Sequence, residues 1–173
     1  MLRIERLLPP TGQARPAGAT LTLPFELRRR SRLLVRLDNG EEAGLFLERG
    51  TVLADGAELE GGDGRIVRVV AAAEDVYVVR PSAACSLVQA AYHLGNRHVP
   101  VEIGAGFLKI ERDAVLRDML ERAGALVSEE SAPFQPEPGA YGGGHRHGHD
   151  AGQAEEHGLA QSVFALRHGG RGA

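Results

Sequence analysis

The sequence of 173 residues has a single cysteine, no tryptophan, and aromatic side chains at only 5% of its positions. The lone cysteine, Cys85, excludes an internal disulfide, so nothing suggests an oxidising compartment. So few aromatic rings argue against a platform on which single-stranded nucleic acid would stack. The formal charge of −3 also lacks the basic excess that is typical of nucleic-acid binding. We therefore expect no nucleic-acid partner.

Long apolar segments are missing as well. The longest runs, Val69–Ala73 and Val76–Val79, are far shorter than the roughly 20 residues that span a bilayer. Arg3, Glu5 and Arg6 interrupt the apolar core that a secretory signal would need. We expect a cytoplasmic protein with no membrane segment, long enough for one medium domain or two small ones.

Residues 1–74 show the pattern of a small all-β domain. Thr20–Leu23 alternates polar and apolar residues, as a half-buried strand does. Asn39-Gly40 separates two strand-like segments and is typical of a tight hairpin. Arg65–Val70 is another predicted strand. The run Arg28–Arg30 is interpreted as a solvated edge that discourages aggregation, with a binding patch as the alternative.

Residues 75–140 change to a mixed pattern. The predicted elements are, in order, a strand at 75–79, a helix at 82–94, strands at 99–103 and 107–110, a helix at 114–123 and a strand at 125–127. This order predicts a ferredoxin-like βαββαβ domain. Cys85, within the first predicted helix, is expected to be a small apolar filler. The fold class is thus α+β: a small all-β domain, a ferredoxin-like domain, and a flexible histidine-containing tail at residues 141–173.

Five of the seven histidines follow Gly144, three of them as alternating residues. In an extended chain His145, His147 and His149 would point to one side at intervals of about 6.5–7 Å. Imidazole suits nickel, copper and zinc, and Asp150 adds an oxygen beside them. The segment therefore predicts metal binding, whereas the alternative is a disordered tail whose histidines only maintain solubility.

A second pair of histidines lies at the end of the first predicted helix. On a continuous helix His93 and His98 would be about 140° apart, so both can approach one ion only if the helix ends between them. Gly95-Asn96 is a suitable end because both residues tolerate a left-handed cap. His93 would then occupy the last turn, with His98 on the segment leading to the next strand. The alternative is that His93 caps the helix and His98 packs under the sheet.

The segment Ala91–Ile103, which contains His93-Leu94-Gly95-Asn96-Arg97-His98, closely resembles the central motif of the urease accessory protein E family. The resemblance extends to Asp113–Leu120, to Phe134–Tyr141 and to the histidine-bearing tail, and more loosely to the β domain. It implies a nickel metallochaperone for urease maturation, built as a homodimer with a nickel site on the two-fold axis.

The same resemblance assigns residues. The ligand at the dimer interface is His98, with His93 as a weaker candidate and the tail histidines as helpers. Some members carry histidines on both sides of the aspartate that opens the second helix, where this chain has Arg112 and Ala114. Asp113 itself is expected to cap that helix. The implied partners are a urease accessory GTPase and the urease apoprotein maturation complex, with the β domain engaging them.

Two imidazoles, one from each subunit, leave open several of the roughly four to six positions of a Ni(II) ion, so water or tail histidines must complete the site. An incomplete site favours transfer, because an acceptor's ligands can enter before the donor's leave. Imidazole ligands alone cannot exclude Cu(II) or Zn(II). Because they bind only when neutral, metal should be lost below about pH 6.5.

The sequence leaves two alternative functions to consider. A zinc hydrolase needs three firm ligands, a bound water and a general base, and the sequence has no His-Glu-x-x-His motif. We therefore expect no enzyme. The second alternative is a protein- or peptide-binding maturation module, in which the β domain captures partners at a strand edge and metal binding is incidental.

Overall fold

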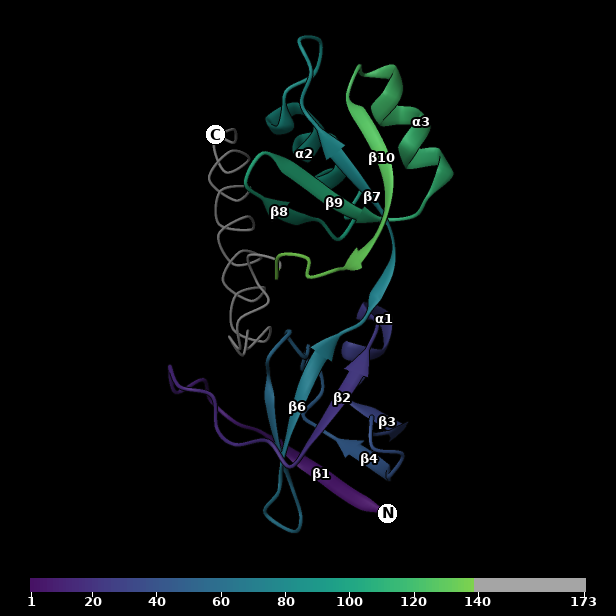
Figure 1. Cartoon of the computed structure of the whole chain (residues 1–173). Coiled ribbons are helices and arrows are strands. Elements are labelled where there is room, and N and C mark those ends of the chain that lie inside the picture. The colour runs from purple at the N-terminus through teal and green to yellow at the C-terminus, as the bar shows by residue number, and fades with distance from the viewer. Residues whose placement is uncertain (139–173) are drawn as a thin grey trace, which may run out of the picture. The chain divides into compact units, whose positions relative to one another are not determined.

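The computed structural model describes residues 1–138, and everything below concerns this part of the chain. Its first half forms a six-stranded sheet (Figure 1). The strands are β1 (Leu2–Leu7), β2 (Ala19–Leu23), β3 (Arg32–Arg36), β4 (Glu42–Phe46), β5 (Glu58–Gly61) and β6 (Ile66–Ala71). Their order is β2-β6-β5-β1-β4-β3, in which β1 pairs with β4 and β2 with β6 in parallel, and the other neighbours are antiparallel. The short helix α1 (Phe25–Arg28) follows β2.

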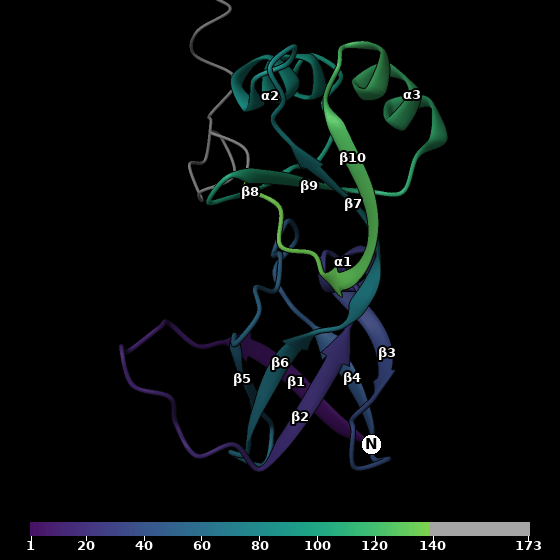
Figure 2. The same cartoon turned by 45° about the horizontal axis from the view of Figure 1, so that its top comes forward.

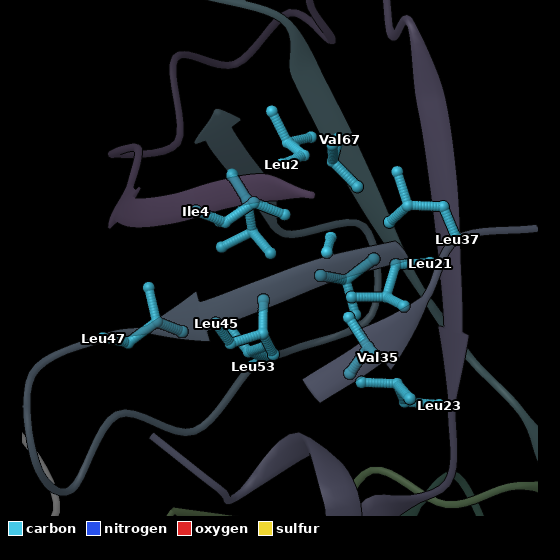
Figure 3. Close-up of a cluster of buried hydrophobic side chains, with 13 residues drawn as sticks. Leu2, Ile4, Leu21, Leu23, Val35, Leu37, Leu45, Leu47, Leu53 and Val67 are labelled. Atoms are coloured by element: carbon cyan, nitrogen blue, oxygen red, sulfur yellow. The ribbon is translucent and has the colours of Figure 1, made fainter. Parts of the chain in front are cut away.

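Alternating side chains of these strands build one apolar core (Figure 3). In β6, for example, Val67 and Val69 are fully buried while the residues between them are only partly covered. Leu21 of β2, Ile4 of β1 and Leu45 of β4 meet them in the same cluster. The predicted β-rich character of this part of the chain is confirmed.

The second half forms a four-stranded sheet and two helices (Figure 2). The elements are β7 (Ala73–Arg80), α2 (Leu87–Gly95), β8 (Glu102–Gly104), β9 (Phe107–Glu111), α3 (Ala114–Arg122) and β10 (Leu126–Pro133). The predicted element order is therefore confirmed. The sheet order is β10-β7-β9-β8 with every pair antiparallel, which places β10 and β8 at opposite edges.

The central strand β7 is buried on both faces. Tyr77 and Val79 pack in the cluster that includes residues of α2 and α3, so both helices cover one face of the sheet. Val76 and Val78 belong to another cluster, on the opposite face, with Phe25 and Phe134. The aromatic rings of these last two residues lie edge to face, with centroids 5.3 Å apart.

Two local predictions were wrong. Arg28 does not lie on a solvated edge: it ends α1 and is 0% exposed, whereas its neighbours Arg29 and Arg30 are exposed. Four acceptors surround its guanidinium, which removes the need for water. Cys85 is buried in the core as expected, but it precedes α2 rather than lying within it, because Ser86 is the N-cap.

Candidate metal centre

The helix α2 carries the first histidine pair, and its sequence defines both ends. At its start, Ser86 and Gln89 form a capping box: the Ser86 hydroxyl accepts from the Gln89 amide, and the Gln89 side chain accepts from the Ser86 amide. This satisfies two backbone donors that a helix start otherwise leaves unpaired. His93 lies in the last turn, as predicted.

The end of α2 is a Schellman motif with histidine in the position usually taken by glycine. The Val99 amide donates to the Leu94 carbonyl at 3.2 Å, and the His98 amide donates to the Gly95 carbonyl at 2.9 Å. Leu94 and Val99 both pack in the core beneath the motif. His98 has φ of +55°, and it is the sole non-glycine residue of the described chain with a positive φ.

The predicted helix end at Gly95-Asn96 is confirmed, since α2 ends at Gly95 with Asn96 as its C-cap, but the left-handed residue is a different one. Gly95 is still helical, and Asn96 has the right-handed values φ −64° and ψ −13°. The left-handed residue is His98 itself. By comparison, α3 ends in the same two hydrogen bonds, with Gly124 at the equivalent place and φ of +90°. There a Cβ would lie 2.7 Å from the Ala84 Cβ, so glycine is required for space as well.

Both histidines of this segment are exposed. His93 lies beside Tyr92, with ring centroids 5.5 Å apart, and its carbonyl accepts from the Arg97 guanidinium at 3.1 Å. Val88 and Tyr92 are one helical turn apart and are 79% and 69% exposed. The surface of α2 next to the histidines is thus apolar and open.

One subunit does not complete a metal site within residues 1–138. No group of three or more His, Cys, Asp or Glu side chains is close enough there to hold an ion. His145, His147 and His149 lie outside the described residues, so their ligation stays a prediction. The Cys85 thiol is buried and donates to the Ser86 carbonyl at 3.6 Å, which confirms its role as a filler.

Asp113 has the predicted capping role. Its Oδ1 accepts from the Val115 and Leu116 amides at 2.8 and 3.0 Å, at the start of α3. The neighbouring Arg112 guanidinium lies 3.4 Å from the Asp75 carboxylate and 3.3 Å from the Glu129 carboxylate. This region is therefore an ion-paired helix start.

A hollow of about 400 Å³ lies in the β domain, and neither His93 nor His98 lines it. It is lined by residues 7–14, by Val52 and by residues 54–58, and none of these is histidine or cysteine. One of its two lining carboxylates, Glu58, lies 2.5 Å from the Arg15 guanidinium. The hollow thus offers no imidazole or thiolate metal ligand.

Sequence reasoning missed Arg28 as a residue that joins distant segments. It donates to the carbonyls of Leu23, Leu53 and Phe134 and to the side chain of Gln135. Burial lowers the pKa of the Arg28 guanidinium, and nearby Glu74, Asp55 and Glu102 oppose this shift. Within the run of three arginines, the sequence contains no signal that singles out the buried one.

None of the helices in residues 1–138 has the length and apolar character needed to cross a bilayer.

The comparisons with known proteins cover both halves of the chain. Residues 4–72 match the family model described as UreE urease accessory protein, N-terminal domain, and residues 74–162 match the model of its C-terminal domain. A urease accessory protein UreE from Paraburkholderia xenovorans is 56% identical over 98% of this chain and 77% of its own length. One from Burkholderia thailandensis is 61% identical over 87% of this chain and 70% of its own length. The chain therefore belongs to the UreE family of urease accessory proteins.

Proposed function

We propose that this protein takes part in urease maturation as a nickel metallochaperone, which delivers Ni(II) during assembly of the urease active site. Two copies would share a site centred on His98, with His93 as a secondary ligand and His145, His147 and His149 completing the coordination. Ni(II) is the cargo, and Cu(II) or Zn(II) would compete for the same imidazoles.

The observation that carries this proposal is the left-handed backbone of an exposed histidine. An L-residue in this conformation costs about 1–2 kcal/mol, and glycine would avoid the cost. Backbone strain of this kind concentrates at functional sites. The motif that contains His98 also holds Leu94 and Val99 in the core, so the histidine is presented from a fixed position.

A homodimer is supported by the exposed surface of α2. Val88 and Tyr92 present apolar area next to His93, and burying such area against a second copy would be favourable. In a two-fold arrangement each copy contributes the same histidine. The site then lacks several ligands, which the tail can supply and an acceptor can replace.

Several further assignments belong to this proposal. The order β10-β7-β9-β8 with α2 and α3 on one face supports a ferredoxin-like class for residues 75–140, next to a partner-binding β domain at residues 1–74. We place the protein in the cytoplasm and give it a urease accessory GTPase and the urease apoprotein as partners. We assign it no catalytic reaction.

Calorimetric nickel titration combined with sedimentation tests the proposal. His98→Asn is the test variant, because asparagine tolerates the left-handed backbone but lacks the imidazole. The variant should remain folded and lose the dimer-linked site, while a chain ending at Tyr141 should bind fewer ions and keep that site. Nickel binding by His98→Asn as tight as that of the parent would refute the assignment.

A second candidate function, capture of a protein segment by the β domain, is favoured by the edge strand β3. Leu47 donates to the Ser31 carbonyl and Leu37 to the Glu41 carbonyl, so the backbone groups of residues 32, 34 and 36 face outward. Leu34 is 66% exposed between Arg32 and Arg36. An acidic extended segment with a central apolar residue would fit this edge.

Two variants separate segment capture at β3 from nickel delivery: Leu34→Glu, and the matched surface control Leu126→Glu. The measured quantity is the affinity of each variant for the accessory GTPase. A module of this kind should lose the GTPase in Leu34→Glu alone, with nickel affinity unchanged. Equal GTPase binding by both variants would exclude the β3 edge.

A further inference from the structure

The sheet of the β domain has an outer face that carries apolar side chains of its own. On β1, β4 and β3, the side chains of Ile4, Leu45 and Val35 point into the core that Figure 3 shows. Side chains alternate along a strand, so the residues that flank these three lie on the opposite, outer face. We call this surface the Gly44 face. Its members are Arg3, Arg32, Leu34, Arg36, Gly44 and Phe46.

The centre of the Gly44 face is apolar. Gly44 pairs with Leu34 of β3, and the Leu34 side chain is 66% exposed. A Cβ at position 44 would lie 2.7 Å from Cε2 of Phe46, so the aromatic ring lies against this glycine. Phe46 is still 39% exposed. Leu34 and Phe46 thus adjoin one another at Gly44, and adjoining exposed apolar side chains, unlike single ones, indicate an interaction site.

Three arginines surround this apolar centre. Arg3 pairs with Gly44 from the side of β1, and its guanidinium lies 4.6 Å from the centroid of the Phe46 ring. Arg32 pairs with Phe46, and Arg36 ends β3. Aromatic and arginine side chains are enriched at protein–protein interfaces and contribute much of their binding energy. The Gly44 face therefore has the composition of a contact surface for another protein.

The Gly44 face is positively charged, although the formal charge of the whole chain is −3. The Arg3 guanidinium lies 2.7 Å from the Glu5 carboxylate, and that of Arg36 lies 3.8 Å from Glu42. Within residues 1–138, Arg32 forms no ion pair. Three arginines on this face thus meet only two carboxylates, which favours a partner that brings further carboxylates.

A second copy of the chain does not suit this surface. In a two-fold contact the same face meets itself, so the arginines of one copy would lie against those of the other. Like charges placed opposite each other across an interface disfavour the pairing. The charge of the Gly44 face thus favours a different, acidic protein.

We infer that the Gly44 face is a docking surface for a partner protein whose contact region is apolar at its centre and carries carboxylates around it. The inference rests on the proposed binding of partners by the β domain, and it differs from capture of a segment at the β3 edge. β4 pairs with β1 on one side and β3 on the other, so its backbone is not open to an added strand. Phe46 can therefore contact a partner only through its side chain.

Calorimetric titration with the accessory GTPase tests the inference on the full chain. Phe46→Ser removes the ring, and Leu126→Ser is the matched control, because Leu126 is 60% exposed on a strand outside the Gly44 face. The Kd for the GTPase should rise about 10-fold or more in Phe46→Ser and stay at the parent value in the control. Gly44→Ala should raise the Kd by less, because its Cβ displaces the ring without removing it. Nickel affinity should be unchanged in all three variants.

Two charge reversals keep the test decisive if Phe46→Ser folds poorly. Arg32→Glu and Arg122→Glu change the net charge equally, but Arg122 lies on α3, outside the Gly44 face. Arg32→Glu should raise the Kd for the GTPase about 3- to 10-fold at low ionic strength, and this difference should shrink as salt is added. Arg122→Glu should bind the GTPase as the parent does.

The outcomes separate this inference from the proposed function. GTPase affinity equal to that of the parent, in folded Phe46→Ser or in Arg32→Glu, would overturn the Gly44 face while the partner assignment stands. Equal losses in Arg32→Glu and Arg122→Glu would overturn it as well, since net charge and not this surface would then decide the affinity. If the parent chain itself does not bind the GTPase, the proposed partner assignment fails and the inference fails with it.

Discussion

Replacing His98 by glycine should make the protein more stable while removing its proposed metal ligand. His98 has φ of +55° at the end of α2, in the place that Gly124 occupies at the end of α3. A left-handed backbone costs an L-residue about 1–2 kcal/mol. Glycine avoids this cost, so His98→Gly relieves backbone strain that any other substitution at position 98 would retain at least in part.

The expected gain follows from two opposing contributions. Relief of the backbone strain contributes about 1–2 kcal/mol. Glycine also gains conformational freedom in the unfolded chain, which offsets about 0.5–1 kcal/mol. The difference spans about 0–1.5 kcal/mol, and its midpoint of about 0.75 kcal/mol corresponds to a rise of about 2–3 °C in Tm for a chain of this size. His98→Ala keeps the strain and should lie within about 0.5 kcal/mol of the parent.

Chemical denaturation in the presence of a chelator measures this order of stability without a contribution from bound metal. Gly124→Ala is the matched control: it introduces the strain at the equivalent place in α3, and its Cβ would also lie 2.7 Å from the Ala84 Cβ. It should destabilise the protein by at least about 1 kcal/mol. If His98→Gly were no more stable than His98→Ala, the strain argument for His98 would be refuted.

Three further predictions concern the same elements and the β domain. Gly95→Ala should stabilise the protein by up to about 1 kcal/mol in denaturant unfolding, because Gly95 is helical and its Cβ would meet no atom within 4 Å; a loss of stability would indicate a left-handed Gly95. Asp113→Ala should lower the free energy of unfolding by about 1 kcal/mol because the N-cap is lost, and Asp113→Ser should restore that stability. Both variants should bind nickel as tightly as the parent. Weaker nickel binding by either variant would instead make Asp113 a ligand. The hydrogen bond from the Arg15 side chain lowers the pKa of Glu58 below its ordinary 4.5, so its contribution is complete above that value and is lost as the pH falls through the folded pKa. The stability difference between the parent and Glu58→Gln should thus be constant near neutral pH and shrink in acid, and a difference that grows in acid would contradict the sign.

The sequence predicted elements wherever the local pattern is decisive. The alternation of Thr20–Leu23 and the turn at Asn39-Gly40 correspond to β2 and to the hairpin of β3 and β4. β1 was not predicted, because only Leu2 and Ile4 are buried and charged residues fill most of the remaining positions. Its assignment as a central strand depends on pairing with β4 and β5, which are about 40 to 60 residues away in the sequence. Local patterns do not contain such pairings.

Local sequence rules predicted neither the left-handed backbone of His98 nor the burial of Arg28. The helix ends at Gly95-Asn96, as local propensity favours, but the hydrogen bond from Val99 to Leu94 and the core contacts of these two residues place the left-handed backbone at His98. Arg28 has the same sequence surroundings as Arg29 and Arg30. Its burial results from acceptors on Phe134 and Gln135, more than 100 residues later in the chain.

His98 and Arg28 each carry a free-energy cost in the folded state, and this connects the stability of the chain to its proposed function. A glycine at position 98 would be more stable than histidine, and a buried guanidinium is expensive because water is replaced only by carbonyl and amide oxygens. Local rules are broken most often where function requires it. Here the two exceptions are linked through Gln135: its side chain accepts from the Arg28 guanidinium, and its amide donates to Glu102, which follows His98 by four residues. The chain thus accepts lower stability at the end of α2, where the proposed nickel ligand is presented.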